Sequence, residues 1–180
     1  GARVELTIDA RRQALVESVI RRAGRAAAVV IEADTGAVVA MASVPCYDPN
    51  NFIPSISCAR KQAYDENLAA PYLNRSIAGF TPGSTYKIPT AITGALAGMA
   101  NRRINCSGFV AYGNHRIGCW IYNQFGGAHG TLDLTQAIQR SCNSYFNRMA
   151  NMIGAEGMVR GFQLVGLGRR TGIRLPGEDP

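Results

Sequence analysis

Ser84 and Lys87 form the pair of residues whose types and spacing most clearly indicate chemistry in this chain. Lysine is rare here, since the chain has two lysines, Lys61 and Lys87, among nineteen basic residues. A serine and a lysine three residues apart on a helix lie on one face, where the hydroxyl and the amine can share a proton. A desolvated lysine amine can act as a base, which a guanidinium does not do in a protein. The pair therefore predicts an activated serine nucleophile.

A purely structural role also fits Ser84 and Lys87, so a second motif is needed to decide between the structural and the catalytic interpretation. Ser84 is a suitable helix N-cap, and Lys87 would then extend into solvent. The second motif, Ser141-Cys142-Asn143, falls in a predicted break between two helices. In a structural interpretation Asn143 caps the following helix. In a functional interpretation Ser141 relays a proton to a leaving amine, and the Asn143 carboxamide holds a peptide backbone.

Composition limits the classes of function. The chain has 180 residues, 47% of them apolar, 17% charged, and a formal net charge of +7. This size and apolar content suit one domain with a real core. The basic residues are scattered arginine doublets rather than a stripe with interleaved aromatics, so we expect no nucleic-acid partner. No apolar run is long enough to span a bilayer, and the first residues do not resemble a signal peptide.

The first eighty residues predict a helix and a hairpin followed by mostly irregular chain. The expected elements are a strand at Leu6-Thr7-Ile8, a helix after an Asp9 N-cap that ends at Gly24, and an antiparallel hairpin of Ala26–Ile31 with residues 37–42. The hairpin strands are apolar throughout, which predicts burial on both faces. Residues 44–80 are rich in proline and are expected to be irregular.

The remaining residues predict helices separated by loops. The expected elements are a helix at 84–98, a glycine-rich loop at 101–130, a helix at 131–140, a helix after Asn143, a short helix around Met158 to Phe162, and a turn-rich end. Leu134, Ala137 and Ile138 are expected to face inward. Two strands alone make a marginal sheet, so we expect strands that complete it to lie beyond residue 180.

The ordered set of motifs resembles the class B penicillin-binding proteins, in particular the penicillin-binding protein 2-like transpeptidase domain. The matching stretches are Leu6–Asp9, Val29–Ile31 with Gly36, Ala40–Ser43, Tyr47–Asn50, Asn74-Arg75, Pro82–Lys87, His129-Gly130, Ser141–Asn143 with Tyr145-Phe146, and Gly166–Gly168 to Gly177-Glu178. They run in the expected order over nearly the whole chain. Ser-x-x-Lys and Ser-x-Asn belong, with Lys-Thr-Gly, to the signature of acyl-serine enzymes.

This resemblance implies the fold, the site and the partners. The fold is an α/β fold of the α+β type, β-lactamase/transpeptidase-like, with residues 1–180 as the N-terminal portion of one transpeptidase domain. Ser84 would attack the bond between the last two D-alanines of a peptidoglycan stem peptide, with Lys87 as base, Ser141 as proton relay and Asn143 holding the substrate. β-Lactam antibiotics and cell-wall elongation proteins are implied partners. The implied location is the bacterial cell envelope, on the periplasmic side of the inner membrane, through an anchor outside this chain. No cofactor is required.

The third signature element, Lys-Thr-Gly, does not occur in the chain. In the family this triplet lies after the Leu-Pro-Gly-Glu region and contributes half of the oxyanion hole. Loss of one oxyanion donor typically costs about 10²–10³ in rate. We therefore expect these 180 residues alone to be impaired or inactive, although the parent protein is an enzyme. The alternatives are a D-Ala-D-Ala carboxypeptidase, a β-lactamase-like or β-lactam-sensing domain, and a non-catalytic cell-wall scaffold.

Three cysteines and one histidine form a further candidate site. They are Cys106, Cys119, His129 and Cys142. Three thiols and one imidazole suit tetrahedral zinc, although their spacing matches no compact zinc-finger pattern. Some members of the resembled subgroup carry a zinc site beside the Ser-x-Asn motif, where a metal would position Ser141 and Asn143. A Cys106–Cys119 disulfide and free buried thiols are the alternatives. Cys46 and Cys58 are expected only to pack.

Overall fold

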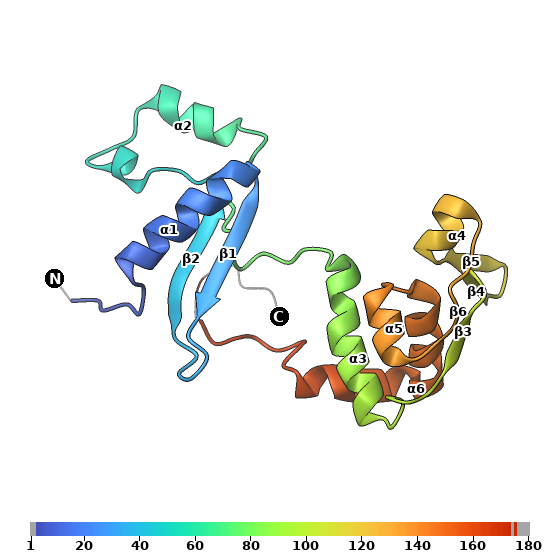
Figure 1. Cartoon of the computed structure of the whole chain (residues 1–180). Helices are drawn as coiled ribbons and strands as arrows, with labels where there is room; N and C mark the ends of the chain where they lie inside the picture. Colours follow the sequence, from blue (N-terminus) through green and yellow to red (C-terminus); the bar gives the residue numbers. More distant parts are fainter. Residues whose placement is uncertain (1–2, 174, 176–180) are drawn as a thin grey trace. The chain divides into compact units, whose positions relative to one another are not determined.

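The computed structural model describes residues 3–173 and residue 175. The chain divides into two compact units, one reaching to Phe80 and including Leu175, and the other Thr81–Ile173 (Figure 1). Each unit has its own helices and strands. Among the described residues, no helix combines the length and the apolar character that a bilayer crossing needs.

A helix and a two-stranded antiparallel sheet form the centre of the first unit. In Figure 1, α1 (Ala10–Ile20) lies along the hairpin of β1 (Ala26–Ile31) and β2 (Val38–Val44). The predicted N-cap is confirmed, because the Asp9 carboxylate accepts hydrogen bonds from the first amides of α1 at 2.9 Å. The predicted hairpin is also confirmed. Burial on both faces is wrong for β1, whose residues Val29 to Ile31 are exposed, whereas β2 carries most of the burial of this unit.

The segment before α1 lines the outer edge of β2 without becoming a strand. The Asp9 amide donates to the Val39 carbonyl at 2.9 Å, and the Thr7 hydroxyl donates to the Val38 carbonyl at 2.6 Å. These bonds satisfy part of the strand edge, but they do not form a regular ladder. The prediction of a strand at Leu6-Thr7-Ile8 is therefore wrong, although the segment does lie against the sheet.

Residues 44–80 are mostly irregular, as predicted, but they contain a short 3₁₀ helix, Pro49–Phe52, and α2 (Cys58–Asp65). The sequence analysis missed α2 because this helix is polar and buries none of its residues. Four aromatic rings gather in this region with centroids 5.2–6.5 Å apart, and we call them the tyrosine cluster: Tyr47, Phe52, Tyr64 and Tyr72. Most of these contacts are edge or tilted and that of Phe52 with Tyr64 is stacked, and such contacts stabilise a loop that has little regular structure.

The second unit is mostly helical. Its helices are α3 (Lys87–Leu96), α4 (Trp120–Phe125), α5 (Leu134–Gln139) and α6 (Asn143–Leu164). A capping box at Asp133 begins α5, so this helix is shorter than the predicted 131–140. Leu134 and Ala137 are buried as predicted, whereas Ile138 is exposed. The two helices predicted after Asn143 are confirmed as one kinked helix, because Gly154 interrupts α6 with a φ of 78°.

The predicted loop at 101–130 is instead built from short strands and a helix. β3 (Ile104–Cys106) pairs with β6 (Gly130–Leu132), and β4 (Phe109–Tyr112) pairs with β5 (His115–Gly118). The α4 helix follows β5. Strands of three or four residues are too short to show a period in the sequence, and for this reason the prediction failed. Turns end the described chain, as predicted, while residues 174 and 176–180 lie outside the described residues.

Close contact between α3 and α6 fixes the centre of the second unit. A Cβ on Gly94 of α3 would lie 2.4 Å from the Met149 sulfur, and a Cβ on Gly161 of α6 would lie 2.3 Å from Thr93. Glycine at both places therefore lets the helices approach. Tyr145, Met149 and the three cysteines at 106, 119 and 142 belong to one buried core cluster beside this contact.

Candidate active site

Ser84 and Lys87 lie where the chain enters α3. Gly83–Tyr86 forms a 3₁₀ turn that continues directly into the helix at Lys87. The Lys87 side chain points back along the helix, and its Nζ donates a hydrogen bond to Ser84 Oγ at 2.9 Å. The predicted one-turn geometry of hydroxyl and amine is thus present. Ser84 in the first turn also lies among helix amides that have no intrahelical acceptor.

The second motif meets the first at the Lys87 amine. Nζ also lies 2.9 Å from Ser141 Oγ, 3.1 Å from the Ser141 carbonyl oxygen and 2.6 Å from Asn143 Oδ1, so four oxygens share the three hydrogens of its ammonium form. The Ser141 hydroxyl in turn donates to Ser84 Oγ at 3.1 Å. The four residues predicted from the sequence therefore share one continuous hydrogen-bond network. Charge-assisted bonds of this length are stronger than neutral ones, so the amine holds the two motifs together.

Backbone geometry at the break between α5 and α6 presents Ser141 and Asn143 to the lysine. Ser141 has a φ of 47°, a left-handed conformation that is unusual for a residue with a side chain. The structural interpretation, in which Asn143 caps α6, does not hold, because Cys142 is the N-cap and its Sγ accepts a hydrogen bond from the Tyr145 amide at 3.4 Å. As the first residue of α6, Asn143 is free to point its amide at Lys87.

Burial lowers the pKa of the Lys87 amine below its usual range. Charge interactions with Cys119 and Cys142 act in the opposite direction and raise the pKa of the amine. The net direction is downward, which is the direction that a lysine needs to accept a proton from a serine near neutral pH.

Sequence reasoning missed one partner of the amine, the main-chain carbonyl of Ser141. This carbonyl reaches Lys87 because of the left-handed conformation of Ser141. The sequence did contain one indication, namely a predicted break between two helices at Ser141, a residue other than glycine. A non-glycine residue at such a break can take an unusual backbone conformation when the surrounding structure holds it there.

Cys106, Cys119, His129 and Cys142 also come together. Their ligand atoms all lie within 4.8 Å of one another. His129 Nδ1 lies 3.5 Å from Cys119 Sγ and 3.8 Å from Cys106 Sγ, and the sulfurs of Cys119 and Cys142 are 3.9 Å apart. We call these four residues the thiol–imidazole cluster. All three cysteines are free, so the structure does not contain the alternative Cys106–Cys119 disulfide.

The surroundings of the thiol–imidazole cluster shift the pKa values of its groups in different directions. Burial raises the pKa of Cys142 to about 12. Burial lowers the pKa of His129, which keeps the imidazole neutral and able to bind a metal through nitrogen. For Cys106, burial acts against ionisation, but hydrogen bonds from the His129 and Gly108 amides lower the pKa overall. Cys46 and Cys58, expected to pack, are instead exposed.

Comparison with known proteins identifies the family. The model of the penicillin binding protein transpeptidase domain matches residues 26–180. The peptidoglycan D,D-transpeptidase MrdA of Salmonella typhimurium strain SL1344 is 34% identical over 186 residues, covering 99% of this chain and 29% of the relative. The chain therefore spans less than a third of that protein's length.

Solved structures agree with this match. Penicillin-binding protein PBP2 of Helicobacter pylori, in a complex with MreC, is 28% identical with a TM-score of 0.82, covering 96% of this chain and 32% of that one. An imipenem acyl-enzyme complex of penicillin-binding protein A from M. tuberculosis is 25% identical with a TM-score of 0.80, covering 93% and 41%. The expected fold class, a mixed helix-and-strand transpeptidase-like fold present in part, is confirmed. The chain belongs to the penicillin-binding protein transpeptidase domain family, of the class B, PBP2-like kind.

Proposed function

We propose that the protein containing this chain is a peptidoglycan D,D-transpeptidase with an acyl-serine mechanism. The observation that carries the proposal is the Lys87 amine, which hydrogen-bonds Ser84 Oγ, Ser141 Oγ and Asn143 Oδ1 at 2.6–2.9 Å. One base with a lowered pKa, one nucleophile, one proton relay and one amide are what acyl transfer requires. The name of the Salmonella relative gives the same activity for that protein.

In this mechanism Ser84 Oγ attacks the carbonyl between the last two D-alanines of a stem peptide. Lys87 Nζ takes the hydroxyl proton as the new C–O bond forms, and the C–N bond to the terminal D-alanine breaks. The Ser141 hydroxyl, bonded to both Lys87 Nζ and Ser84 Oγ, passes a proton to the departing amine. Asn143 keeps Lys87 in place and holds the substrate amide. An amine from a second stem then attacks the ester carbonyl: the new C–N bond forms the cross-link, the ester C–O bond breaks, and the proton that the incoming amine loses passes through Lys87 to Ser84 Oγ.

The partners follow from the same chemistry. A β-lactam presents a strained amide to Ser84 and remains bound as an ester, and the imipenem acyl-enzyme of the M. tuberculosis homologue supports this step. The MreC complex of the H. pylori homologue supports an elongation protein as a partner. We place the protein in the cell envelope, on the periplasmic side of the inner membrane, because its substrate is assembled there.

The described residues form the N-terminal portion of a single transpeptidase domain in this proposal. A sheet of two strands is marginal by itself, and Val29, Val30 and Ile31 of β1 are exposed, although they are apolar. Additional strands of the same domain would cover them. In the full-length protein, hydrogen exchange is expected to be slow at the β1 amides that face away from β2 as well as at those that bond to β2. Rapid exchange at the amides that face away from β2 would contradict this assignment.

The thiol–imidazole cluster fits a structural zinc ion. Tetrahedral bonds of the usual Zn–S and Zn–N lengths place sulfurs about 3.8 Å apart and a sulfur about 3.6 Å from a nitrogen. Three of the six separations are close to these values, namely 3.9 Å between the sulfurs of Cys119 and Cys142 and 3.5 and 3.8 Å from His129 Nδ1 to the sulfurs of Cys119 and Cys106, and all four ligand atoms lie within 4.8 Å of one another. Zinc bound here would hold Cys142, and with it the backbone between Ser141 and Asn143; it supplies no step of the reaction.

The metal assignment is tested without measuring activity. Full-length protein purified without chelator is expected to contain about one zinc per chain by elemental analysis, and chelation is expected to lower its melting temperature. Cys106→Ala is expected to lose the metal, while Cys58→Ala, at an exposed cysteine outside the cluster, retains it. Metal-free wild-type protein with an unchanged melting temperature would contradict the assignment.

The enzymatic assignment is tested by acylation. Full-length protein is expected to react with a fluorescent penicillin, and the adduct is expected to map to Ser84 by peptide mass analysis. Ser84→Ala is expected to abolish the label, whereas Ser76→Ala, at another serine, retains it. A cross-linked product from two stem peptides separates a transpeptidase from a carboxypeptidase or a β-lactamase, both of which hydrolyse the acyl-enzyme. A label on any other residue would refute the mechanism.

A further inference from the structure

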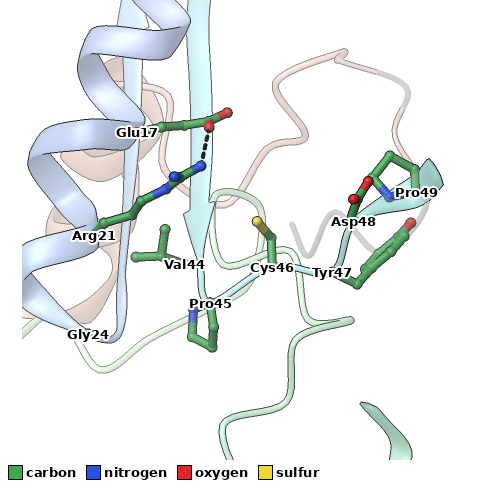
Figure 2. A pocket seen from close by; sticks show the side chains of 9 residues that line it. All are labelled: Glu17, Arg21, Gly24, Val44, Pro45, Cys46, Tyr47, Asp48 and Pro49. Carbon is green, nitrogen blue, oxygen red and sulfur yellow. Dashed lines mark hydrogen bonds and ion pairs between the residues drawn. The ribbon is translucent and has the colours of Figure 1, made fainter. Parts of the chain in front are cut away.

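A groove runs beside α1 in the first unit. It consists of two adjoining cavities of about 680 and 310 Å³, which share Glu17, Cys46 and Tyr47. We call it the α1 groove. Figure 2 shows the larger cavity, with the Cys46 side chain between Arg21, which directly follows α1, and Asp48 on the loop after β2. Cavities of this size are typical of small-molecule sites.

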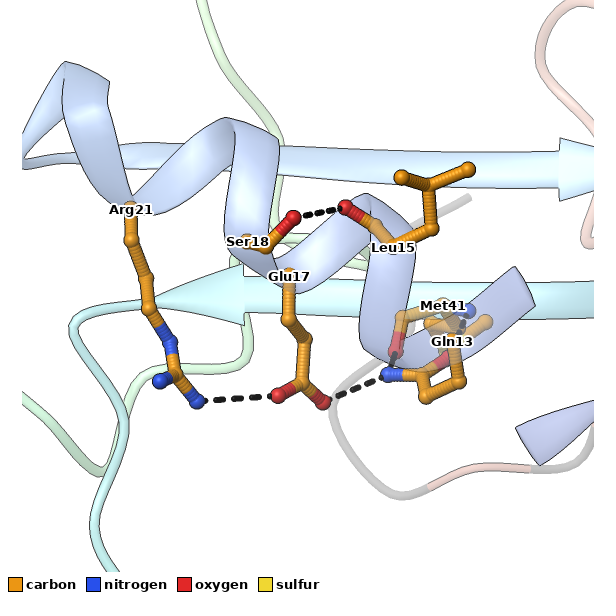
Figure 3. A network of polar contacts seen from close by, with 6 residues as sticks. All are labelled: Gln13, Leu15, Glu17, Ser18, Arg21 and Met41. Atoms are coloured by element: carbon orange, nitrogen blue, oxygen red, sulfur yellow. Dashed lines mark hydrogen bonds and ion pairs between the residues drawn. The ribbon is translucent and has the colours of Figure 1, made fainter. Parts of the chain in front are cut away.

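One wall of the groove is a polar row along α1, held in place by the sheet. The Gln13 amide donates to the Met41 carbonyl and accepts from the Met41 amide, both at 2.8 Å (Figure 3). Gln13 also donates to Glu17 at 2.9 Å, and Arg21 donates to the other Glu17 oxygen at 3.1 Å. An exposed ion pair contributes little by itself. Here the anchor on β2 fixes the carboxylate, so the groove presents a pre-organised acceptor beside a guanidinium donor.

The opposite side of the groove is aromatic. Tyr47 and Tyr72 of the tyrosine cluster line it, with ring centroids 5.2 Å apart and exposed fractions of 38% and 43%. Their contacts with Phe52 and Tyr64 keep both rings in place. Asp48 adds a second carboxylate, whose described hydrogen bonds, from the Asn50 amide and side chain, both go to Oδ1.

We propose that the α1 groove binds N-acetylated amino-sugar units of a glycan strand. A pyranose ring has an apolar C–H face that packs on an exposed aromatic ring, and hydroxyls that both donate and accept. Glu17 and Asp48 would accept from these hydroxyls, and Arg21 would donate to hydroxyl or acetamido oxygens. The inference rests on the proposed function, which supplies a substrate whose stem peptides are attached to such a strand.

The mixed charge of the groove argues against two other ligands. A simple anion would meet the carboxylates of Glu17 and Asp48 as well as Arg21. A proline-rich peptide would stack on the aromatic rings, but its backbone has few N–H groups to donate. The two carboxylates would then lose water without gaining a donor. A sugar supplies both the apolar face and the donors.

A cysteine footprint tests the proposal on full-length protein. Peptide-free glycan strands, prepared from peptidoglycan with an amidase, are the probe, and alkylation by iodoacetamide is followed by mass spectrometry. Cys46 lies in the groove, while Cys58 is exposed and lies outside it. With the strands at about nine times their Kd, mass action predicts about tenfold slower alkylation of Cys46. The rate at Cys58 is expected to stay unchanged.

Matched variants identify the wall that binds. Arg21→Ala is expected to remove most of the protection of Cys46. Arg160→Ala removes another arginine–glutamate pair with the same four-residue spacing, with Glu156 on α6, and is expected to retain the protection. Equal protection in both variants, no protection in the wild type, or protection by oligoproline but not by glycan strands would overturn the proposal. Penicillin acylation of the same preparation reports on the proposed function separately: a protein that acylates without protection refutes only the groove, and protection without acylation refutes only the serine mechanism.

Discussion

Lys87→Arg is the substitution that tests the mechanism most directly. Arginine keeps the positive charge and the capacity to donate hydrogen bonds, but its guanidinium does not lose a proton in a protein. Among the described side chains, Lys87 is the one base hydrogen-bonded to Ser84 Oγ, so no other group takes its place. Loss of a general base typically costs about 10²–10⁴ in rate, equivalent to about 3–5 kcal/mol in the barrier. We expect acylation by penicillin to fall within that range.

The pH dependence of the acylation rate also tests the role of Lys87 as the base. The reactive form of Lys87 is the neutral amine, so the rate of acylation rises with pH as the ammonium loses its proton. Because burial lowers the pKa of this amine, the rise is expected to level off below the ordinary lysine value of about 10.4. Second-order rate constants for a fluorescent penicillin, measured on full-length protein from about pH 6 to about pH 10, would show this. In Lys87→Arg the rise is expected to disappear.

Lys61→Arg is the matched control, since it changes the chain's other lysine. Lys61 forms an exposed pair with Asp65 at 2.5 Å on α2, and its replacement is expected to leave both the rate and the profile unchanged. A Lys87→Arg protein that acylates within about tenfold of the wild type would refute the role of Lys87 as the base. A wild-type rate that is independent of pH over the same range would refute it as well.

Two substitutions test the packing that positions the site, each by urea denaturation. Gly161→Ala would place a Cβ 2.3 Å from Thr93 and is expected to destabilise the protein by about 1–3 kcal/mol. The control Gly127→Ala, whose Cβ would have its nearest neighbour at 3.5 Å, is expected to change the free energy of unfolding little, and equal effects of the two substitutions would contradict the close approach of α3 and α6. Asp133→Ala removes the capping box of α5, in which the Asp133 carboxylate accepts a hydrogen bond from the Gln136 amide at 2.8 Å. The free energy of unfolding is expected to fall by about 0.5–2 kcal/mol, and an unchanged value would show that the capping box does not stabilise the protein.

Local spacing was sufficient to predict half of the site. Ser84 and Lys87 are neighbours on a helix because of their three-residue separation, and the structure has this helix start. The approach of Ser141 and Asn143 to the same amine depends on how α6 packs against α3, and no local pattern encodes it. The family resemblance supplied that expectation. The structure supplies the distances that make it specific.

Segments outside the helices were predicted less well, for physical reasons. The strands between Ile104 and Gly118 are three or four residues long and owe their pairing to packing, which overrides weak local preferences. Apolar runs predicted a hairpin correctly, but the burial of β1 depends on what covers it, and this is not written in the strand itself. The α1 groove was not predicted at all, because it is formed by residues from the α1 region, from β2 and from two irregular segments.

Cys142 connects the proposed catalytic residues to the thiol–imidazole cluster. Its sulfur caps α6, which fixes where that helix begins, and it also lies in the thiol–imidazole cluster at 3.9 Å from Cys119. The residues on either side of it are the ones that hold Lys87. A serine at this position would retain a cap acceptor but remove one of the three sulfurs. We infer that the thiol–imidazole cluster, by holding Cys142, helps to position Ser141 and Asn143 beside Lys87, and the Ser-x-Asn motif without its middle residue does not predict that dependence.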